Sequence, residues 1–214
     1  KGAIEKAKAN GGKSVVFTFA NHPMEIINID RAPKCINTIE EKIYLFEEMG
    51  IDYLILQPFN KKFADLTAVE FVEILKNKVN SKELFVGFNF SFGEGGKAKT
   101  KDLIELGESM GMKVNEIPAV SIDGEVISST LIRKNLQKGH FEEVNKYLGH
   151  KFLIIGEVIH GKKIARQLGF PTANIKMANR LYPPLGIYGA TLKIEGENIK
   201  RYGVVNIGVN PTLK

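Results

Sequence analysis

Residues 14–19 have the sequence Ser-Val-Val-Phe-Thr-Phe, a β-branched and aromatic run that predicts a buried strand. The segment 3–9 before it predicts the end of a helix, and Ile51–Leu56 predicts a second strand. Between the two strands, Thr38 and Glu41 have the spacing of a capping box, which marks the start of a helix. Helices that alternate with strands in this way predict an α/β architecture, with a parallel sheet covered by helices on both faces.

The same alternation continues to about residue 120. Thr67 and Glu70 form a second possible capping box, and the apolar residues that follow are spaced to lie on one face of a helix. Beyond them the pattern predicts strands over 84–90 and 113–117, and helices over 100–110, 128–138 and 140–148.

After residue 150 the pattern changes to short strands, predicted over 152–159, 187–194 and 201–207. Their spacing predicts an antiparallel barrel or sandwich. The expected fold class is therefore α/β plus β, with a domain boundary between segments 1–150 and 151–214. Because three strands are too few to close a barrel, and because the first domain begins with a helix, we expect the sequence to be incomplete at both ends.

The composition is that of an ordinary globular protein, with 43% hydrophobic and 25% charged residues. The single cysteine, Cys35, excludes an internal disulfide, and no histidine or cysteine cluster has zinc-ligand spacing. No apolar run approaches the ~18 residues of a membrane span, and residues 1–13 lack a signal-peptide core. We expect a cytoplasmic protein that does not bind a membrane.

The net charge of +6 is unevenly distributed. Residues 151–214 carry 10 of the 30 lysines and arginines but only three acidic residues, whereas residues 1–150 are close to neutral. A basic segment attracts anions such as nucleotide phosphates, or nucleic acid, although charge alone more often marks a solvated face.

The segment Ile127–Arg133 places three hydroxyl side chains, Ser128, Ser129 and Thr130, at the start of a predicted helix. A helix N-terminus has unpaired N–H groups and a positive dipole, and is therefore a natural phosphate site. Arg133, one turn further on, can add a charge-assisted contact. The alternative, favoured by spacing alone, is that the hydroxyls only cap an ordinary helix.

A second polar segment follows in the basic part of the chain. In Gly169–Asn174, an extended backbone places Thr172 and Asn174 on one face, where their oxygens suit Mg²⁺ bound with nucleotide phosphates. Pro171 lies just before this pair, and the turn His160-Gly161-Lys162 upstream can cover a polyphosphate. The alternative is a loop in which Asn174 bonds its own backbone.

Two strand ends carry further candidates. Residues 87–93 alternate aromatic and polar side chains and include Asn89, and His22 follows the strand 14–19. Ligands bind beyond the carboxyl ends of strands in parallel sheets. The alternatives are an aromatic core with an incidental asparagine, and a structural histidine.

In their order along the chain, these segments resemble the bacterial bifunctional riboflavin kinase/FMN adenylyltransferase family over nearly the whole length. Ile127–Arg133 matches the ISSTxIR motif, which assigns the nucleotidylyltransferase superfamily, whereas the LGFPTAN and NIGxxPT motifs together are specific to this family. The matching stretches are Phe17–Phe19 with His22-Pro23, Gly87–Gly93, Ile127–Arg133, Gly156–Gly161, Leu168–Asn174 and Val205–Thr212.

The resemblance implies a Rossmann-like adenylyltransferase module over 1–150 and a β-barrel riboflavin kinase module over 151–214. In the first, FMN attacks the α-phosphate of ATP to give FAD; in the second, riboflavin attacks the γ-phosphate to give FMN. Magnesium accompanies ATP. The implied adenylyltransferase contacts are Asn89, Ser128, Ser129, Thr130 and Arg133 for nucleotide, with Phe19, His22 and Phe92 for flavin. The implied kinase contacts are His160, Gly161, Lys162, Pro171, Thr172 and Asn174, of which Thr172 and Asn174 organise the metal.

The sequence also departs from the family pattern. The HxGH motif is expected before residue 1 and the acidic base of the kinase beyond residue 214, so the catalytic residues are expected outside this sequence. Asn21 stands where the family often has an acidic residue, and Asn89 where aspartate is common. We therefore expect these 214 residues alone to catalyse little.

Two alternatives remain open. A single-activity adenylyltransferase with another substrate leaves LGFPTAN and NIGxxPT unexplained. A basic nucleic-acid-binding protein lacks interleaved aromatic residues or an RNA-binding motif, so we expect no nucleic-acid partner.

Overall fold

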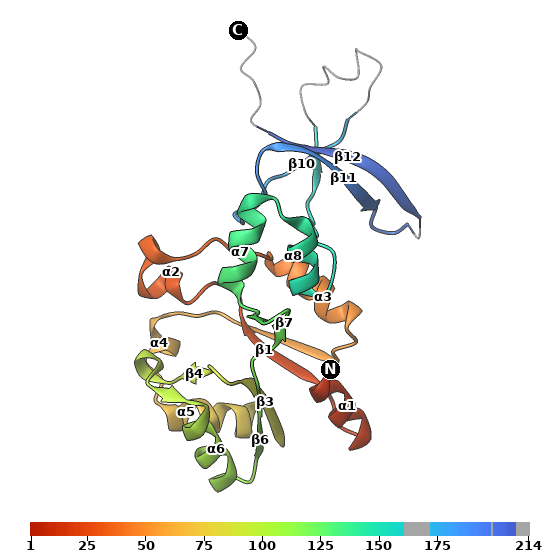
Figure 1. Cartoon of the computed structure of the whole chain (residues 1–214). Helices are drawn as coiled ribbons and strands as arrows, with labels where there is room; N and C mark the ends of the chain where they lie inside the picture. The colour runs from red at the N-terminus through yellow and green to blue at the C-terminus, as the bar shows by residue number, and fades with distance from the viewer. Residues whose placement is uncertain (161–171, 198, 209–214) are drawn as a thin grey trace. The chain divides into compact units, whose positions relative to one another are not determined.

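The computed structural model describes residues 1–160, 172–197 and 199–208. Figure 1 shows the helices and strands along the chain. The described residues divide into two compact units. The first contains residues 1–126 and 154–179, and the second contains residues 127–153 and those from 180 onward. These units do not follow the predicted domain boundary between residues 150 and 151. The division into domains 1–150 and 151–214 stays a prediction.

The first unit contains the four parallel strands that the sequence predicts. Strand β1 (Val15–Phe19) pairs with β2 (Tyr53–Gln57), and β3 (Glu83–Gly87) pairs with β6 (Lys113–Ile117). The sequence predicts one sheet, but in the described residues the strands form two separate parallel pairs. Each pair is connected by a crossover that contains helix, as parallel pairing requires.

Helices connect these strands, and two of them begin at the predicted capping boxes. Thr38 caps α3 (Ile39–Glu48), and Thr67 caps α5 (Ala68–Glu73), which continues as the π-helical turn η2 (Ile74–Lys78). The remaining helical segments of this unit are α1 (Gly2–Ala9), α2 (Met24–Ile27), η1 (Ile29–Arg31), α4 (Lys61–Ala64), η3 (Glu94–Gly96) and α6 (Thr100–Ser109).

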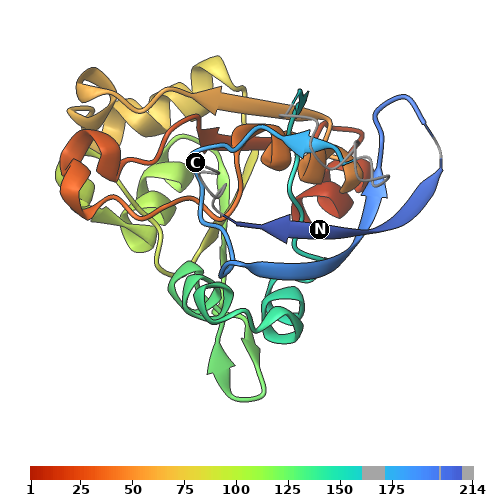
Figure 2. The same ribbon diagram turned by 90° about the horizontal axis from the view of Figure 1, so that it is seen from above.

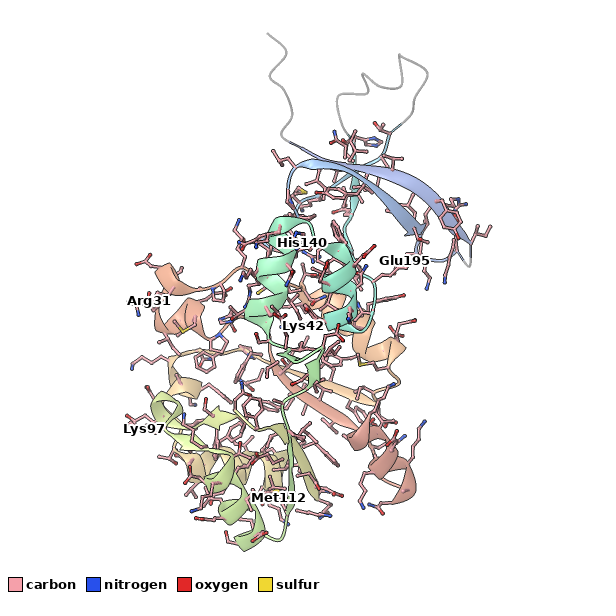
Figure 3. All side chains as sticks on the ribbon, viewed as in Figure 1. Arg31, Lys42, Lys97, Met112, His140 and Glu195 are labelled. Atoms are coloured by element: carbon pink, nitrogen blue, oxygen red, sulfur yellow. The ribbon has the colours of Figure 1, made fainter. Side chains whose placement is uncertain are left out.

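The core of the first unit lies where α5, η2 and α6 pack with the strands. Met112, labelled in Figure 3, is 2% exposed and belongs to this cluster. Its other buried members are Phe71, Val72, Leu75, Phe92 and Leu103. The apolar face predicted for the helix after Thr67 is therefore confirmed.

Short antiparallel pairs complete this unit. The turn Asp123-Gly124 joins β7 (Ser121–Ile122) to β8 (Glu125–Val126) as a hairpin, which Figure 2 shows clearly. Both turn residues have positive φ, 52° and 81°, as a tight hairpin turn requires. The other short pairs are β4 (Ser91–Phe92) with β5 (Ala98–Lys99), and β9 (Val158–Ile159) with β10 (Asn174–Ile175).

The second unit combines two helices with a long antiparallel ribbon. Helices α7 (Ser129–Lys138) and α8 (Phe141–Leu148) both end at glycines, and β11 (Gly186–Lys193) pairs with β12 (Lys200–Ile207). Arg180 is 1% exposed and donates to the Leu153 carbonyl at 3.1 Å. Its guanidinium also lies 4.8 Å from the centre of the Phe152 ring, so Arg180 connects the end of the helical segment to the start of the ribbon.

Two strand predictions are wrong in extent. The strand predicted over 152–159 is a strand only at β9, because side chains bond the backbone before it: the Phe152 N–H donates to Asn145, and the Ile155 N–H donates to Glu41. The strand predicted over 84–90 ends at Gly87, where the chain turns and the Phe90 N–H donates to the Gly87 carbonyl at 3.0 Å.

The described residues contain small antiparallel sheets but no closed barrel. The ribbon β11–β12 and the pair β9–β10 form separate two-stranded sheets. The observed fold is thus a mixed α/β first part followed by antiparallel β-structure.

Candidate functional site

The carboxyl end of β1 leads into an aromatic cluster. Phe19, the last residue of β1, is partly buried, and its ring centre lies 5.0 Å from that of Phe59 and 5.4 Å from that of Phe63. Both pairs have the edge-to-face geometry that aromatic rings favour. Phe19 is therefore part of a preformed aromatic wall at a strand end, with some of its surface still accessible.

The loops after β1 and β2 are joined by a two-point hydrogen bond. The Asn21 side chain accepts from the Phe59 N–H at 2.8 Å and donates to the Phe59 carbonyl at 3.0 Å. An ionised aspartate can accept the first bond but cannot donate the second. From the sequence, Asn21 removes a charge but keeps an amide that can form hydrogen bonds; in the structure this amide fixes one loop to the other.

His22, the flavin candidate in the same loop, is partly buried. Its Nδ1 accepts a hydrogen bond from the Met24 N–H at 3.1 Å, which orients the ring at the start of α2. The structure thus gives this histidine a local structural contact, and its role toward a flavin stays a prediction.

The turn after β3 carries Asn89. Asn89 is exposed, whereas Phe92, five residues beyond the end of β3, is 6% exposed, and its ring centre lies 5.4 Å from that of Phe71. The predicted aromatic core is present here, and the flavin contact of Phe92 stays a prediction. Sequence analysis missed Thr100, which is 3% exposed and donates its hydroxyl to the Gly87 carbonyl at 3.2 Å, fixing the end of β3.

The N-terminus of α7 has the predicted arrangement. Ser128 is the N-cap, and its hydroxyl accepts from the Leu131 N–H at 3.2 Å. Ser129 and Thr130 are exposed, and Arg133 is partly buried one turn further on. The capping interpretation is therefore correct for Ser128, while two hydroxyls next to the unpaired N–H groups of the first turn remain accessible.

Of the kinase candidates that the structure describes, Asn174 lies in the short pair β9–β10 and His160 and Thr172 lie next to it in sequence. Asn174 is opposite Ile159 in the ladder, and His160 follows Ile159 directly. Thr172, Asn174 and His160 are all exposed. Gly161, Lys162 and Pro171 lie outside the described residues, so half of this predicted site has no structural description.

The oxygen donors of Thr172 and Asn174 fit a hard cation bound jointly with phosphate. In the part of the chain that the structure describes, no group of three or more histidine, cysteine or acidic side chains is placed to hold a metal ion. This donor set is consistent with a metal that arrives with a nucleotide, which supplies the remaining ligands.

The candidates fall into separate groups. Ser128 to Arg133 belong to the second compact unit, and the remaining described candidates belong to the first. Within the first unit, hydrogen bonds join the loop of His22 to that of Phe59, and β9 to β10. Among the described residues, no helix is both long and apolar enough to cross a membrane.

Comparison with known families gives two matches in tandem. The model of the FAD synthetase family matches residues 1–131, and that of the riboflavin kinase family matches residues 148–214.

Curated relatives match the whole chain. Bifunctional riboflavin kinase/FMN adenylyltransferases are 36% identical over 96% of the chain in Buchnera aphidicola subsp. Schizaphis graminum, and 32% identical over 100% in Escherichia coli strain K12. The relative from Bacillus subtilis strain 168 is 35% identical over 99% of the chain. The chain covers 66%, 68% and 66% of these three proteins, about two thirds of their length.

A solved structure has the same fold. The crystal structure of a macrolide-efflux protein from Streptococcus pneumoniae superposes with a TM-score of 0.79 at 29% sequence identity. The match covers 99% of this chain and 68% of that one.

Proposed function

The chain belongs to the bifunctional riboflavin kinase/FMN adenylyltransferase family, and from this premise we propose that it takes part in both ATP-dependent steps of flavin cofactor synthesis. The first step converts riboflavin to FMN, and the second converts FMN to FAD. The tandem match to an FAD synthetase and a riboflavin kinase family model carries this proposal, because each step then has its own segment of the chain.

We assign the adenylyltransferase module to residues 1–150 and the kinase module to residues 151–214, the second as part of a riboflavin kinase β-barrel. The substrates are riboflavin, FMN and ATP, and neither nucleic acid nor a membrane takes part. The compartment is the cytoplasm, where riboflavin and ATP are both available.

In the adenylyl step, a phosphate oxygen of FMN attacks the α-phosphorus of ATP. The bond from the α-phosphorus to the oxygen bridging to the β-phosphorus breaks, and pyrophosphate leaves. Ser129 and Thr130 at the exposed start of α7 donate to the phosphates, with Ser128 shaping the cap. Arg133 and Asn89 add contacts, so the step depends on positioning and charge neutralisation.

The flavin ring binds at the strand ends of the same module. Phe19 offers an aromatic surface in a cluster that is already packed, and His22 lies in the loop fixed by Asn21. Phe92 supports this region from the core. A preformed wall costs little ordering on binding.

In the kinase step, the 5′-hydroxyl oxygen of riboflavin attacks the γ-phosphorus of ATP, the bond to the bridging oxygen breaks, and ADP leaves. The hydroxyl proton passes to a general base. Thr172 and Asn174 would hold Mg²⁺, which would neutralise phosphate charge when bound. His160, with Gly161, Lys162 and Pro171, covers the polyphosphate.

The test is to follow products from the full-length enzyme by chromatography. With riboflavin, ATP and magnesium, we expect FMN to form first and FAD to follow. FAD formation from FMN without any FMN formation from riboflavin would instead identify a single-activity adenylyltransferase. Formation of neither product would overturn the proposal.

A further inference from the structure

The chain contains two capping boxes that are almost identical at their own helices. In both, a glutamate at the third helical position accepts the N–H of the capping threonine at 2.8 Å: Glu41 from Thr38, and Glu70 from Thr67. In both, the threonine hydroxyl accepts the glutamate N–H, at 3.3 and 3.2 Å. Capping alone therefore makes the same demands on the two glutamates.

The second carboxylate oxygen distinguishes them. Glu41 is 0% exposed, and its Oε1 accepts the N–H of Ile155 at 3.0 Å, 114 residues away in the sequence. Glu70 is exposed, and within the described part of the chain its carboxylate accepts hydrogen bonds only from Thr67 of its own capping box. A buried carboxylate is costly unless both oxygens are bonded, so the contact with Ile155 is part of what keeps Glu41 in place.

The contact joins the two family segments. Glu41 lies in the segment that matches FAD synthetase, and Ile155 lies in the segment that matches riboflavin kinase. Both belong to the same compact unit. Residues 151–157 form neither helix nor strand, so their position depends on individual contacts such as this one.

From Ile155 a short path leads to the candidate kinase site. Two residues on, the Glu157 carbonyl accepts the Lys176 N–H at 2.9 Å, and β9 then pairs with β10 so that Ile159 lies opposite Asn174. Between them, a side chain on Gly156 would come within 2.4 Å of the Ile175 side chain, so this backbone passes close against β10. A shift at Ile155 therefore displaces the ladder that carries Asn174.

We propose that Glu41 is a positioning residue for the kinase reaction: from the adenylyltransferase segment, its carboxylate holds the chain entering β9 and thereby places Asn174 for ATP. This proposal rests on the proposed function of Asn174. Glu41 touches neither substrate, and it acts through the backbone of Ile155.

The test compares Glu41→Gln with Glu70→Gln in the full-length enzyme. Glutamine has one acceptor oxygen, so at position 41 either Thr38 or Ile155 loses its acceptor and meets an NH₂ group instead. We expect kcat/KM for ATP in FMN formation to fall about tenfold in Glu41→Gln, mainly through a higher KM. A tenfold fall is the lower end of what the loss of a hydrogen bond to a charged group causes. FAD formation from FMN should stay within about twofold, and Glu70→Gln should leave both reactions within about twofold.

Hydrogen exchange provides a readout that does not depend on activity. The Ile155 amide should exchange at least about tenfold faster in Glu41→Gln than in Glu70→Gln, because it loses a bonded acceptor. Should Glu41→Gln fail to fold, Glu41→Asp replaces it: the shorter side chain keeps a carboxylate at the start of α3 but does not reach Ile155.

Two results would overturn the proposal. One is an unchanged KM for ATP with unchanged exchange at Ile155. The other is an equal fall of kcat in both reactions with unchanged KM values, which indicates a smaller folded fraction rather than a displaced site. If the unsubstituted enzyme forms neither FMN nor FAD, the proposed function fails instead, and that outcome is read before any variant is compared.

Discussion

In the segment that matches FAD synthetase, side chains from α5, η2 and α6 enclose one another, and Val72 and Leu103 are both 0% exposed. In the segment that matches riboflavin kinase, the ribbon β11–β12 is held by its own backbone ladder, while Ile187, Val204 and Tyr202 are 75%, 74% and 90% exposed. The first segment is stabilised by a core and the second by strand pairing. The proposed phosphate-binding residues also differ in their support, because α7 is a ten-residue helix with Ser128 as its N-cap, whereas Asn174 lies in a two-residue strand.

The largest effect is expected from Asn174→Ala. Removing this oxygen donor should lower FMN formation by about a hundredfold or more, because the loss falls on phosphate positioning in the transition state. FAD formation from supplied FMN should survive. The measurement is the rate of each product by chromatography, with the exposed Thr191→Ala on β11 as the control. Loss of both activities together would break the division into two sites.

The converse test is Arg133→Ala, which should lower the rate of FAD formation by roughly ten- to a hundredfold. This is the range expected when a charge-assisted contact of ~1.5–3 kcal/mol is lost. FMN formation should stay unchanged. Lys134→Ala, an exposed cation one position further along α7, is the matched control. An unaltered rate of FAD formation in Arg133→Ala would remove this arginine from the phosphate site.

A pair of identical substitutions tests the packing difference itself. Val72→Ala should lower the free energy of unfolding by about 2 kcal/mol, because two buried methyl groups are lost and a cavity remains. Val204→Ala, at 74% exposure, should change it by less than about 0.5 kcal/mol. Urea unfolding measures both. Equal costs would mean that another surface covers the ribbon in solution.

The smallest effect concerns pH at the start of the β1–β2 pair. The Ser14 N–H at 2.9 Å, then the Ser14 hydroxyl at 2.7 Å and Lys13 at 3.0 Å, hold the pKa of Asp52 well below its ordinary value. A lowered folded-state pKa stabilises the protein fully above the unfolded value of about 4, and this contribution is lost progressively as the pH falls from there through the folded-state pKa. Asp52→Asn should therefore lower the urea midpoint most near pH 7.

Below about pH 4 the difference between Asp52→Asn and the unsubstituted protein should shrink. A difference that stays constant from pH 7 to about pH 3 would show that the geometry of the side chain, rather than its charge, fixes the two strands. Glu70→Gln serves as a control for the position of the charge. The pKa of Glu70 is also lowered, but this carboxylate lies at the start of α5 and not at the β1–β2 pair.

Local signals explain what was predictable from the sequence. The boxes at Thr38 and Thr67 and the glycines after α7 and α8 act within one turn of helix, and the structure confirms the elements they begin or end. The strands 187–194 and 201–207 were also predictable, because each is a short run rich in apolar residues.

Contacts between distant residues explain what was missed. The strand predicted over 152–159 is shortened because Glu41 bonds the Ile155 N–H, and no local pattern reveals a partner 114 residues away. The two hydrogen bonds between Asn21 and Phe59 could not be predicted from the sequence for the same reason, since each residue alone is an ordinary loop residue. Of the site, the exposed start of α7 was predictable from hydroxyl spacing, whereas Thr100 carried no signal of its burial.

The most direct test of two separate ATP reactions follows the phosphorus atoms of ATP in the full-length enzyme. With ATP labelled at its γ-phosphorus and riboflavin, the label should appear in FMN. With ATP labelled at its α-phosphorus and FMN, the label should appear in FAD. Unlabelled FMN in the first experiment, or unlabelled FAD in the second, would contradict the account.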